Sequence, residues 1–226
     1  MRRGCASVPA PGRARLPQPR PGYLPRAEIG TYSAAAMAES VGTLEVVTTF
    51  LEMMQRPRKV RSPAPMDRPV ALLRAEHPPL HFYRYLYETV GAPWLWYERR
   101  TLDDDALTAT IHDPRVEIRV LYVDGCPAGF VELDRRVPDE VELAYCGLVP
   151  EFIGQGLGLY LIDAAVDRAW SSEPTPQRVW VHTCNLDHPR ALLAYQHAGF
   201  VPYREEPSVI DDPRATGAMS RAATAP

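Results

Sequence analysis

Two runs of alternating apolar and polar residues, joined by a short turn, constrain the fold of this chain most strongly. The first run, V-E-I-R-V-L-Y-V, spans Val116–Val123, and the second, A-G-F-V-E-L-D-R, spans Ala128–Arg135. Asp124-Gly125 follows the first run, and Asp-Gly is a preferred pair in the tight turns of β-hairpins. The sequence therefore predicts an antiparallel pair of strands near the middle of the chain.

Further strands and helices are predicted on both sides of this hairpin. Clusters of β-branched and apolar residues predict strands over residues 44–53, 70–76, 140–149 and 178–184. Helical periodicity and end signals predict helices over residues 80–90, 103–113, 157–170 and 189–199. Several antiparallel strands come first, and strand, helix, strand, helix follow. This order predicts an α/β (α+β) fold, with a mixed, largely antiparallel sheet flanked by helices.

Two helix faces can be predicted from the same periodicity. In the helix over residues 80–90, Phe82, Tyr85 and Leu86 fall on one face together with Thr89 or Val90, which we expect to be the inner face. In the helix over residues 157–170, Leu157 and Leu161 are expected to point inward, and the carboxylates Asp163 and Asp167 outward.

The ends of the chain differ in composition from its body. Residues 1–36 hold six arginines, one acidic residue and six of the 24 prolines, which predicts a disordered extension, with Met37 as an alternative start. An organellar transit peptide is the alternative interpretation. Residues 44–206 are predicted to form one domain, and residues 207–226, which show no periodicity, a loose tail.

Charge and composition disfavour several classes of protein. Without the first 36 residues the chain carries 19 basic and 27 acidic residues, a balance that repels nucleic acids. No stretch reaches the ~18–20 apolar residues that cross a membrane. The four cysteines lack C-x-x-C spacing, so a reducing cytoplasm is the simplest location. A metal-dependent hydrolase built on the six histidines is a weak alternative, since Pro78 and Pro79 interrupt the pair His77 and His81.

The most informative stretch for chemistry is Gly154-Gln155-Gly156-Leu157-Gly158, where a predicted strand gives way to a helix. Glycines allow a tight turn whose N–H groups converge, and the positive end of the helix strengthens their pull on an anion. This pattern favours a cradle for a diphosphate. It is not the dinucleotide motif, because Leu159 stands at the third glycine position, and the lysine of a P-loop is missing. A sharp turn without a ligand is the alternative.

Two longer stretches include this loop or follow it. They are V-E-L-A-Y-C-G-L-V-P-E-F-I-G-Q-G-L-G, which begins at Val141, and V-W-V-H-T-C-N-L-D-H-P-R-A-L-L-A-Y-Q-H-A-G-F, which begins at Val179. Over residues 140–206 the chain thereby resembles the Gcn5-related N-acetyltransferase (GNAT) superfamily. The resemblance implies the GNAT fold and acetyl-CoA as co-substrate, with no metal. It also implies direct transfer of the acetyl group to an amine in a ternary complex.

The resemblance assigns the cofactor to particular residues. The family loop, Gln/Arg-x-x-Gly-x-Gly/Ala, matches at Gly156 and Gly158, but Ile153 stands at its first position. Backbone amides supply most of the phosphate binding, so the implied diphosphate site comprises Gly154, Gln155, Gly156, Leu157 and Gly158. The pantetheine arm is expected to pair with the main chain of Leu148 and Val149. Either Asn185 or His188 is expected to take the place of a family asparagine.

Acetylation of an amine needs a base, because an ammonium ion cannot attack a thioester. Glu142 occupies the strand position of the catalytic glutamate in histone-type members, so the resemblance implies that it is the base. A solvated carboxylate at a sheet edge is the alternative, and Glu140 and Glu132 are weaker candidates. Tyr195 matches the family tyrosine that protonates the leaving thiolate, although a tyrosine packed in the core is a competing interpretation. His182 is a candidate for a proton relay behind Glu142.

The acceptor is less defined by the sequence. An aromatic group falls where this fold places its acceptor loop, and could hold an amine or an apolar side chain; it comprises Tyr83, Tyr87, Trp94, Trp96 and Tyr97. Burial in the core explains such a group equally well. We expect a small-molecule or peptide amine as acceptor and a monomer or homodimer. A non-catalytic module that binds acyl-CoA on the same fold is the alternative function.

Overall fold

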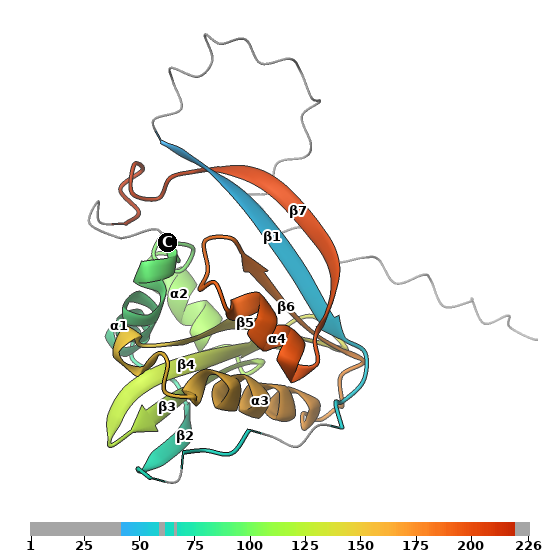
Figure 1. Cartoon of the computed structure of the whole chain (residues 1–226). Helices are drawn as coiled ribbons and strands as arrows, with labels where there is room; N and C mark the ends of the chain where they lie inside the picture. Colours follow the sequence, from blue (N-terminus) through green and yellow to red (C-terminus); the bar gives the residue numbers. More distant parts are fainter. Residues whose placement is uncertain (1–41, 59–61, 66, 220–226) are drawn as a thin grey trace, which may run out of the picture. The chain divides into compact units, whose positions relative to one another are not determined.

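The computed structural model describes residues 42–58, 62–65 and 67–219, which form seven strands and four α-helices (Figure 1). The extension predicted over residues 1–36 lies outside the described residues. The strands are β1 (Thr43–Met53), β2 (Val70–Ala75), β3 (Val116–Val123), β4 (Cys126–Asp134), β5 (Glu140–Leu148), β6 (Arg178–Cys184) and β7 (Val201–Asp211). The helices are α1 (Leu80–Gly91), α2 (Asp104–Ile111), α3 (Leu157–Trp170) and α4 (Ala191–Ala198), with short 3-10 turns η2 (Ala92–Trp94) and η3 (Pro150–Phe152).

The strands form one sheet in the order β2-β3-β4-β5-β6-β1-β7. Every neighbouring pair is antiparallel except β5 and β6, which are parallel. This confirms the predicted mixed, largely antiparallel sheet. The central hairpin is β3–β4, and its turn places Asp124 at φ 51° and Gly125 at φ 79°, as Asp-Gly turns require.

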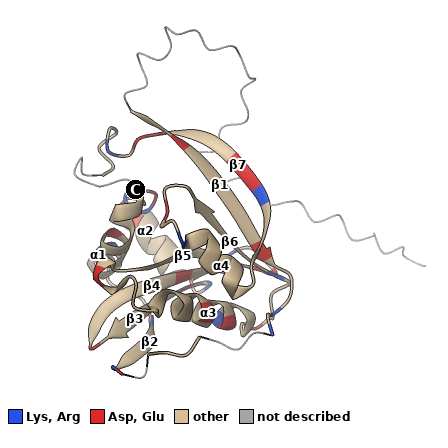
Figure 2. Ribbon diagram, viewed as in Figure 1, with Lys and Arg blue, Asp and Glu red and all other residues tan. Residues whose placement is uncertain are grey.

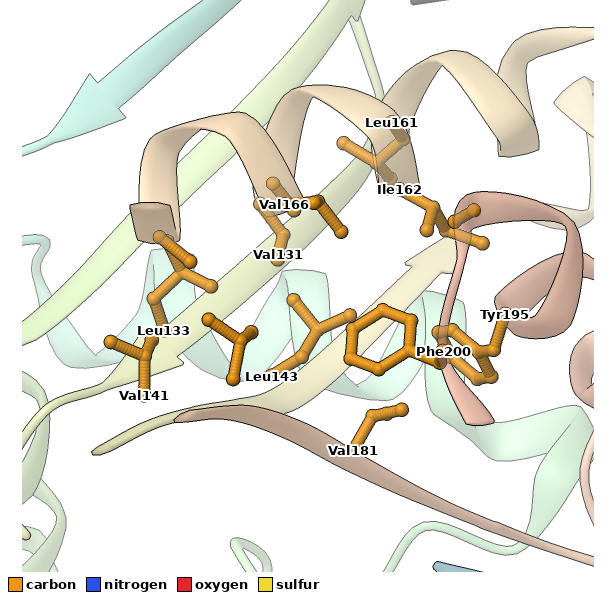
Figure 3. Close-up of a cluster of buried hydrophobic side chains, with 14 of the residues drawn as sticks. Val131, Leu133, Val141, Leu143, Leu161, Ile162, Val166, Val181, Tyr195 and Phe200 are labelled. Atoms are coloured by element: carbon orange, nitrogen blue, oxygen red, sulfur yellow. The ribbon is translucent and has the colours of Figure 1, made fainter. Parts of the chain in front are cut away.

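Helices cover both faces of the sheet. On one face α3 and α4 enclose an apolar cluster with β4, β5 and β6, to which Val131, Leu143, Val181 and Phe200 contribute (Figure 3). On the other face α1 and α2 pack over β3 and β4 around Ile118, Val120 and Phe130. Both faces of β4 are thus covered, and its residues are buried from Ala128 to Asp134, polar ones included.

The predicted helix faces need correction. Leu86 and Val90 are buried as predicted, but Tyr85 is 46% exposed, and Tyr83 and Tyr87 complete the buried face of α1. Phe82, Tyr83, Tyr85 and Tyr87 are distributed around this helix, so periodicity alone does not separate the two faces. The outward position expected for Asp163 is also wrong, since it is 8% exposed beneath the segment that joins β1 to β2.

The predicted loose tail is wrong for residues 207–211. These residues belong to β7, which pairs with β1 from Thr43↔Asp211 to Glu52↔Val201. The sequence does not predict this strand because it contains Pro202, Pro207 and the charged run Arg204–Glu206. A strand at the edge of a sheet tolerates proline and charge, because only one of its sides has to pair. Figure 2 shows both signs of charge along this outer strand.

Candidate active site

The parallel strands β5 and β6 pair over only three residues and then part. Their ladder joins Glu140, Val141 and Glu142 to Arg178, Val179 and Trp180, yet β5 continues to Leu148 and β6 to Cys184. Beyond the last pair β5 stays bonded to β4, where the N–H of Val149 donates to the carbonyl of Ala128 at 2.9 Å. Successive N–H groups of a strand point to opposite edges, so the N–H of Leu148 faces the gap that β6 has left.

The glycine turn lies at the open end of this gap. Gly154 and Gly156 have φ values of +84° and +77°, and a Cβ added at either would meet nothing within 4 Å. Gly156 is the N-cap residue of α3, where no side chain bonds the first N–H groups of the helix. A Cβ on Gly158 would lie 3.9 Å from Cδ1 of Leu148, which brings the turn next to the end of β5. The turn is therefore open outward, with free donors beside an open strand edge.

Two residues of the turn hold it in place through their side chains. Gln155 donates from Nε2 to the carbonyl of Glu151 at 2.7 Å, and its Oε1 accepts from Arg68 at 2.6 Å. Leu157 is 1% exposed and packs in the core beneath α3. Leu157 can therefore offer a ligand only its main-chain N–H. Gln155 can offer its main-chain N–H and the hydrogen-bonding positions of its amide that these two bonds leave unused.

The three candidate glutamates lie in different environments. Glu142 occupies the last pair before the strands part, is 7% exposed, and has Oε1 3.7 Å from Nδ1 of the half-exposed His182. Glu132 is fully buried and bonded by Arg99 and by the hydroxyl of Tyr83, each at 2.5 Å. Glu140 is ion-paired with Arg178, with Oε2 3.3 Å from Nη1 of the guanidinium. Of the three, Glu142 alone lies at the vertex of the gap.

Tyr195 lies on the other face of β5. Val141 and Leu143, on either side of Glu142, pack with Tyr195 in the cluster under α3 and α4, so alternation turns Glu142 to the opposite face. Figure 3 shows Tyr195 beside Phe200, and their rings meet edge to face with centroids 5.9 Å apart.

Burial raises the pKa of Tyr195 well above its usual value, and the neighbouring Cys146 and Asp187 raise it further. Cys146 belongs to the parted segment of β5, and burial raises the pKa of its thiol to about 12. Tyr195 is therefore a neutral phenol at physiological pH, next to the part of β5 that β6 leaves unpaired.

Asn185 and His188 both lie in the loop between β6 and α4, but their side chains contact different parts of the molecule. The amide of Asn185 extends the ladder to β1, because Oδ1 accepts from the N–H of Val47 at 2.9 Å and Nδ2 donates to the carbonyl of Glu45 at 3.2 Å. His188 accepts at Nδ1 from the N–H of Arg190 at 3.1 Å. The imidazole also packs against η2, with its centroid 5.1 Å from that of the Trp94 ring. The side chain of Asn185 thus serves the sheet, and His188 faces the segment after α1.

Sequence reasoning missed Asp187, which ties this loop to the segment after α1. Its Oδ1 accepts from Nε1 of Trp96 at 3.3 Å, and its Oδ2 accepts from Thr183 and from the N–H of Cys184. Trp96 in turn packs on Gly91 and approaches Gly147, where a Cβ would come within 2.4 Å and 3.5 Å of the indole. Such contacts between distant segments leave no periodic signal in a sequence.

The predicted aromatic group does not form one wall. Tyr83 and Tyr87 are 0% and 1% exposed and belong to the core under α1, whereas Trp94, Trp96 and Tyr97 are half-buried. A second set of rings instead lies on β1, β6 and β7, on the same face as Glu142; it comprises Phe50, Trp180, His182 and Tyr203. Arg204 stacks over Phe50 at 4.1 Å. This set depends on the register of β7, which the sequence did not reveal.

Two negative findings concern the described residues. They contain no group of three or more His, Cys, Asp or Glu side chains that could hold a metal ion. None of their helices is long and apolar enough to span a membrane.

Known proteins resemble this chain in sequence profile and in fold. The sequence profile described as "Acetyltransferase (GNAT) family" matches residues 76–200. No curated protein sequence matches the chain. Among solved structures, a GCN5-related N-acetyltransferase from Kribbella flavida has 16% identity and a TM-score of 0.51, over 80% of this chain and 63% of its own.

Two further solved structures are similar in fold. A GCN5-related N-acetyltransferase from Sphaerobacter thermophilus has 15% identity and a TM-score of 0.50, over 78% of this chain and 54% of its own. A conserved protein of unknown function from Staphylococcus epidermidis ATCC 12228 has 18% identity and a TM-score of 0.50, over 81% of this chain and 69% of its own. The fold is thus shared with these proteins, and the profile match covers more than half of the sequence. The chain belongs to the acetyltransferase (GNAT) family.

Proposed function

We propose that the protein transfers an acetyl group from acetyl-CoA to an amine by direct attack in a ternary complex. One observation carries the proposal: the gap between β5 and β6 has Glu142 at its closed vertex and the glycine turn at its open end. An extended thioester bound along the gap would place its diphosphate at the turn. Its reactive end would lie between the carboxylate on one face of β5 and Tyr195 on the other.

The residues around the gap fit acetyl-CoA. The N–H groups of residues 154–158 and the positive end of α3 would hold the diphosphate, since no side chain caps that helix. The N–H of Leu148 would pair with the pantetheine arm as a neighbouring strand does. The N–H of Val149 is already bonded to Ala128, so that residue can contribute only its carbonyl. His188 is the better candidate for the family asparagine, because β1 occupies the amide of Asn185.

Glu142 would remove the proton that makes the acceptor an ammonium ion. The neutral amine then attacks the thioester carbonyl, the new C–N bond forms, and the C–S bond breaks to release the thiolate. The nitrogen loses a second proton as it becomes an amide, and this proton neutralises the thiolate. His182, 3.7 Å from the carboxylate and 43% exposed, would pass the proton to solvent. Because the pKa of Tyr195 is raised above that of a thiol, Tyr195 would stabilise the thiolate by donating a hydrogen bond rather than by giving up its proton.

The acceptor would approach from the face that carries Glu142 and the rings of β6 and β1. Trp180 and His182 flank the carboxylate on this face, and both are accessible to solvent in part. We propose a small-molecule or peptide amine as the acceptor. The alternative, a non-catalytic module that binds acyl-CoA, would use the same gap without needing the carboxylate.

Glu142→Gln distinguishes the two functions. For an enzyme, the variant keeps the Kd for CoA measured by calorimetry within about threefold, while thiol release with a reactive amine falls about 10²- to 10⁴-fold. Glu140→Gln is the matched control, since it removes the same charge two positions away on the same face and should leave turnover within a few fold. If the wild type binds CoA but releases no thiol with any amine of a broad panel, the non-catalytic function is correct. If the wild type binds no CoA, both functions are wrong.

A further inference from the structure

Three described residues between β1 and β2 contact α3 or the glycine turn. Arg56 is ion-paired with Asp167, in the C-terminal half of the helix. Ser62 then donates to Asp163 from its N–H at 2.8 Å and from its hydroxyl at 2.7 Å. Arg68 finally reaches Gln155, in the turn itself. From Arg56 to Arg68, the contacts therefore move from the C-terminal half of α3 to its N-terminal end, where Arg68 lies.

Three hydrogen bonds hold the guanidinium of Arg68 between the glycine turn and the turn of the β3–β4 hairpin. Nη1 donates to Oε1 of Gln155 at 2.6 Å, and Nε and Nη2 donate to Oδ2 of Asp124 at 3.0 Å and 2.6 Å. The guanidinium carbon lies 5.9 Å from the centroid of the Phe152 ring, in η3. The side chain remains 29% exposed, and five N–H donors are more than these contacts use.

Arg68 lies beside a turn that lacks one polar side chain of the family pattern. The family pattern has Gln or Arg three residues before its first glycine, and this chain has Ile153, which is 36% exposed and has no polar atom in its side chain. Gln155 cannot easily replace it, because its amide is bonded to Glu151 and Arg68. Arg68 places a cation beside the same turn from a segment more than 80 residues away in sequence.

We propose that Arg68 is a diphosphate-binding residue of the acetyl-CoA site and replaces the polar side chain that Ile153 lacks. The inference rests on the proposed function. A guanidinium offers a planar fork of donors that matches two phosphate oxygens, and charge-assisted bonds of this kind are stronger than those of neutral amides. Asp124, which is 50% exposed, neutralises part of the charge and orients the fork, as Gln155 does from the other side.

Calorimetric titration with CoA and with 3′-dephospho-CoA tests the inference, because both ligands contain the diphosphate. We expect Arg68→Gln to weaken both by the same factor, about 10- to 100-fold, as the loss of a hydrogen-bonded charge implies. It should also reduce the dependence of the Kd on salt concentration. Arg74→Gln, on the outer strand β2, is the matched control and should change neither ligand's Kd by more than about twofold.

Asp124→Asn separates binding from a structural role for the Arg68–Asp124 pair. It removes the competing negative charge and leaves Arg68 in place, so CoA should bind equally well or several-fold more tightly. If both variants weaken CoA alike, the pair is structural and the inference is wrong. A loss confined to CoA would place Arg68 at the 3′-phosphate and overturn the diphosphate assignment. An unchanged Kd in Arg68→Gln overturns the inference alone, whereas failure of the wild type to bind CoA overturns the proposed function.

Discussion

Glu142 points from one face of β5 and Tyr195 packs against the other. In the proposed mechanism the acceptor therefore loses its proton on one side of the strand, and the thiolate is stabilised on the other. This separation matters because the two groups have incompatible requirements. The base must be ionised and reachable from solvent, whereas the phenol must stay neutral. Burial in the cluster around Phe200 keeps Tyr195 neutral, whereas His182, which is 43% exposed and 3.7 Å from the Glu142 carboxylate, would connect that carboxylate to solvent.

Tyr195→Phe should lower kcat about tenfold or more, because a hydrogen bond to a charged group contributes roughly 1.5–3 kcal/mol. The KM for acetyl-CoA should change little, and so should the melting temperature, since the ring and its contact with Phe200 remain. The raised pKa of Tyr195 also predicts that the wild-type rate does not fall between pH 7 and 9 through ionisation of this residue. Steady-state kinetics measure each quantity, and an unchanged kcat would make Tyr195 a core residue only.

At the scale of single elements, the glycine turn can be tested without disturbing the core. Gly156→Ala should cost about 1–2 kcal/mol of stability, because Gly156 has a φ of +77°, where a Cβ is strained. Gly217→Ala is matched, since Gly217 has a φ of +80° and equally open surroundings. Both variants should lose similar stability in urea. Only Gly156→Ala should weaken CoA, by at least about tenfold; equal CoA affinities would show that the turn binds no diphosphate.

Helix α3 offers a second matched pair of variants. Asp163→Asn should lower the free energy of unfolding by about 1.5–3 kcal/mol, since the buried carboxylate accepts two bonds from Ser62. Asp167→Asn makes the same change one turn later, where the partner Arg56 is 54% exposed, and should cost less than about 1 kcal/mol. Urea unfolding compares them. Similar losses would mean that the segment between β1 and β2 is not anchored at Asp163.

The elements that the sequence predicted correctly are those whose apolar pattern is set by the core. The β3–β4 hairpin and α3 are examples, because each has a face that must be buried. The elements that were missed depend on distant partners. Strand β7, with its prolines and charges, forms because it pairs with β1 at the edge of the sheet. The hydrogen bond between Val47 of β1 and the side chain of Asn185 depends on the same strand order. The contacts of Arg68 with Asp124 and Gln155 likewise join residues that no local pattern relates.

At the scale of the whole molecule, Glu117 links the sheet to α3. It is 3% exposed in β3 and accepts from Arg119 at 2.6 Å and from Arg168 of α3 at 2.7 Å, with Arg135 at 3.1 Å. Burial alone would raise the pKa of Glu117, but the hydrogen bonds from Arg168 and Arg119 and the charge of Arg135 outweigh it and lower the pKa to about 2. The carboxylate is thus more acidic in the folded protein than in the unfolded chain.

This shift predicts how stability depends on pH. A carboxyl with a lowered pKa adds stability above its unfolded value of 4.5 and loses that contribution as the pH falls toward about 2. Glu117→Gln should therefore be less stable than the wild type by roughly 1–3 kcal/mol at pH 7, and the difference should shrink between pH 4.5 and 2. Urea unfolding at several pH values measures it. A difference that stays constant down to pH 2.5 would contradict the prediction.

The pairing of the first described strand with the last has a consequence for synthesis on the ribosome. Strand β1 emerges early, yet both of its neighbours, β6 and β7, come more than 120 residues later, as the bond between Glu52 and Arg178 illustrates. During translation the hairpin β3–β4 can form as soon as it leaves the exit tunnel, while β1 must wait with both edges unoccupied. Nascent chains halted before residue 201 should therefore expose β1 to chaperones and proteases.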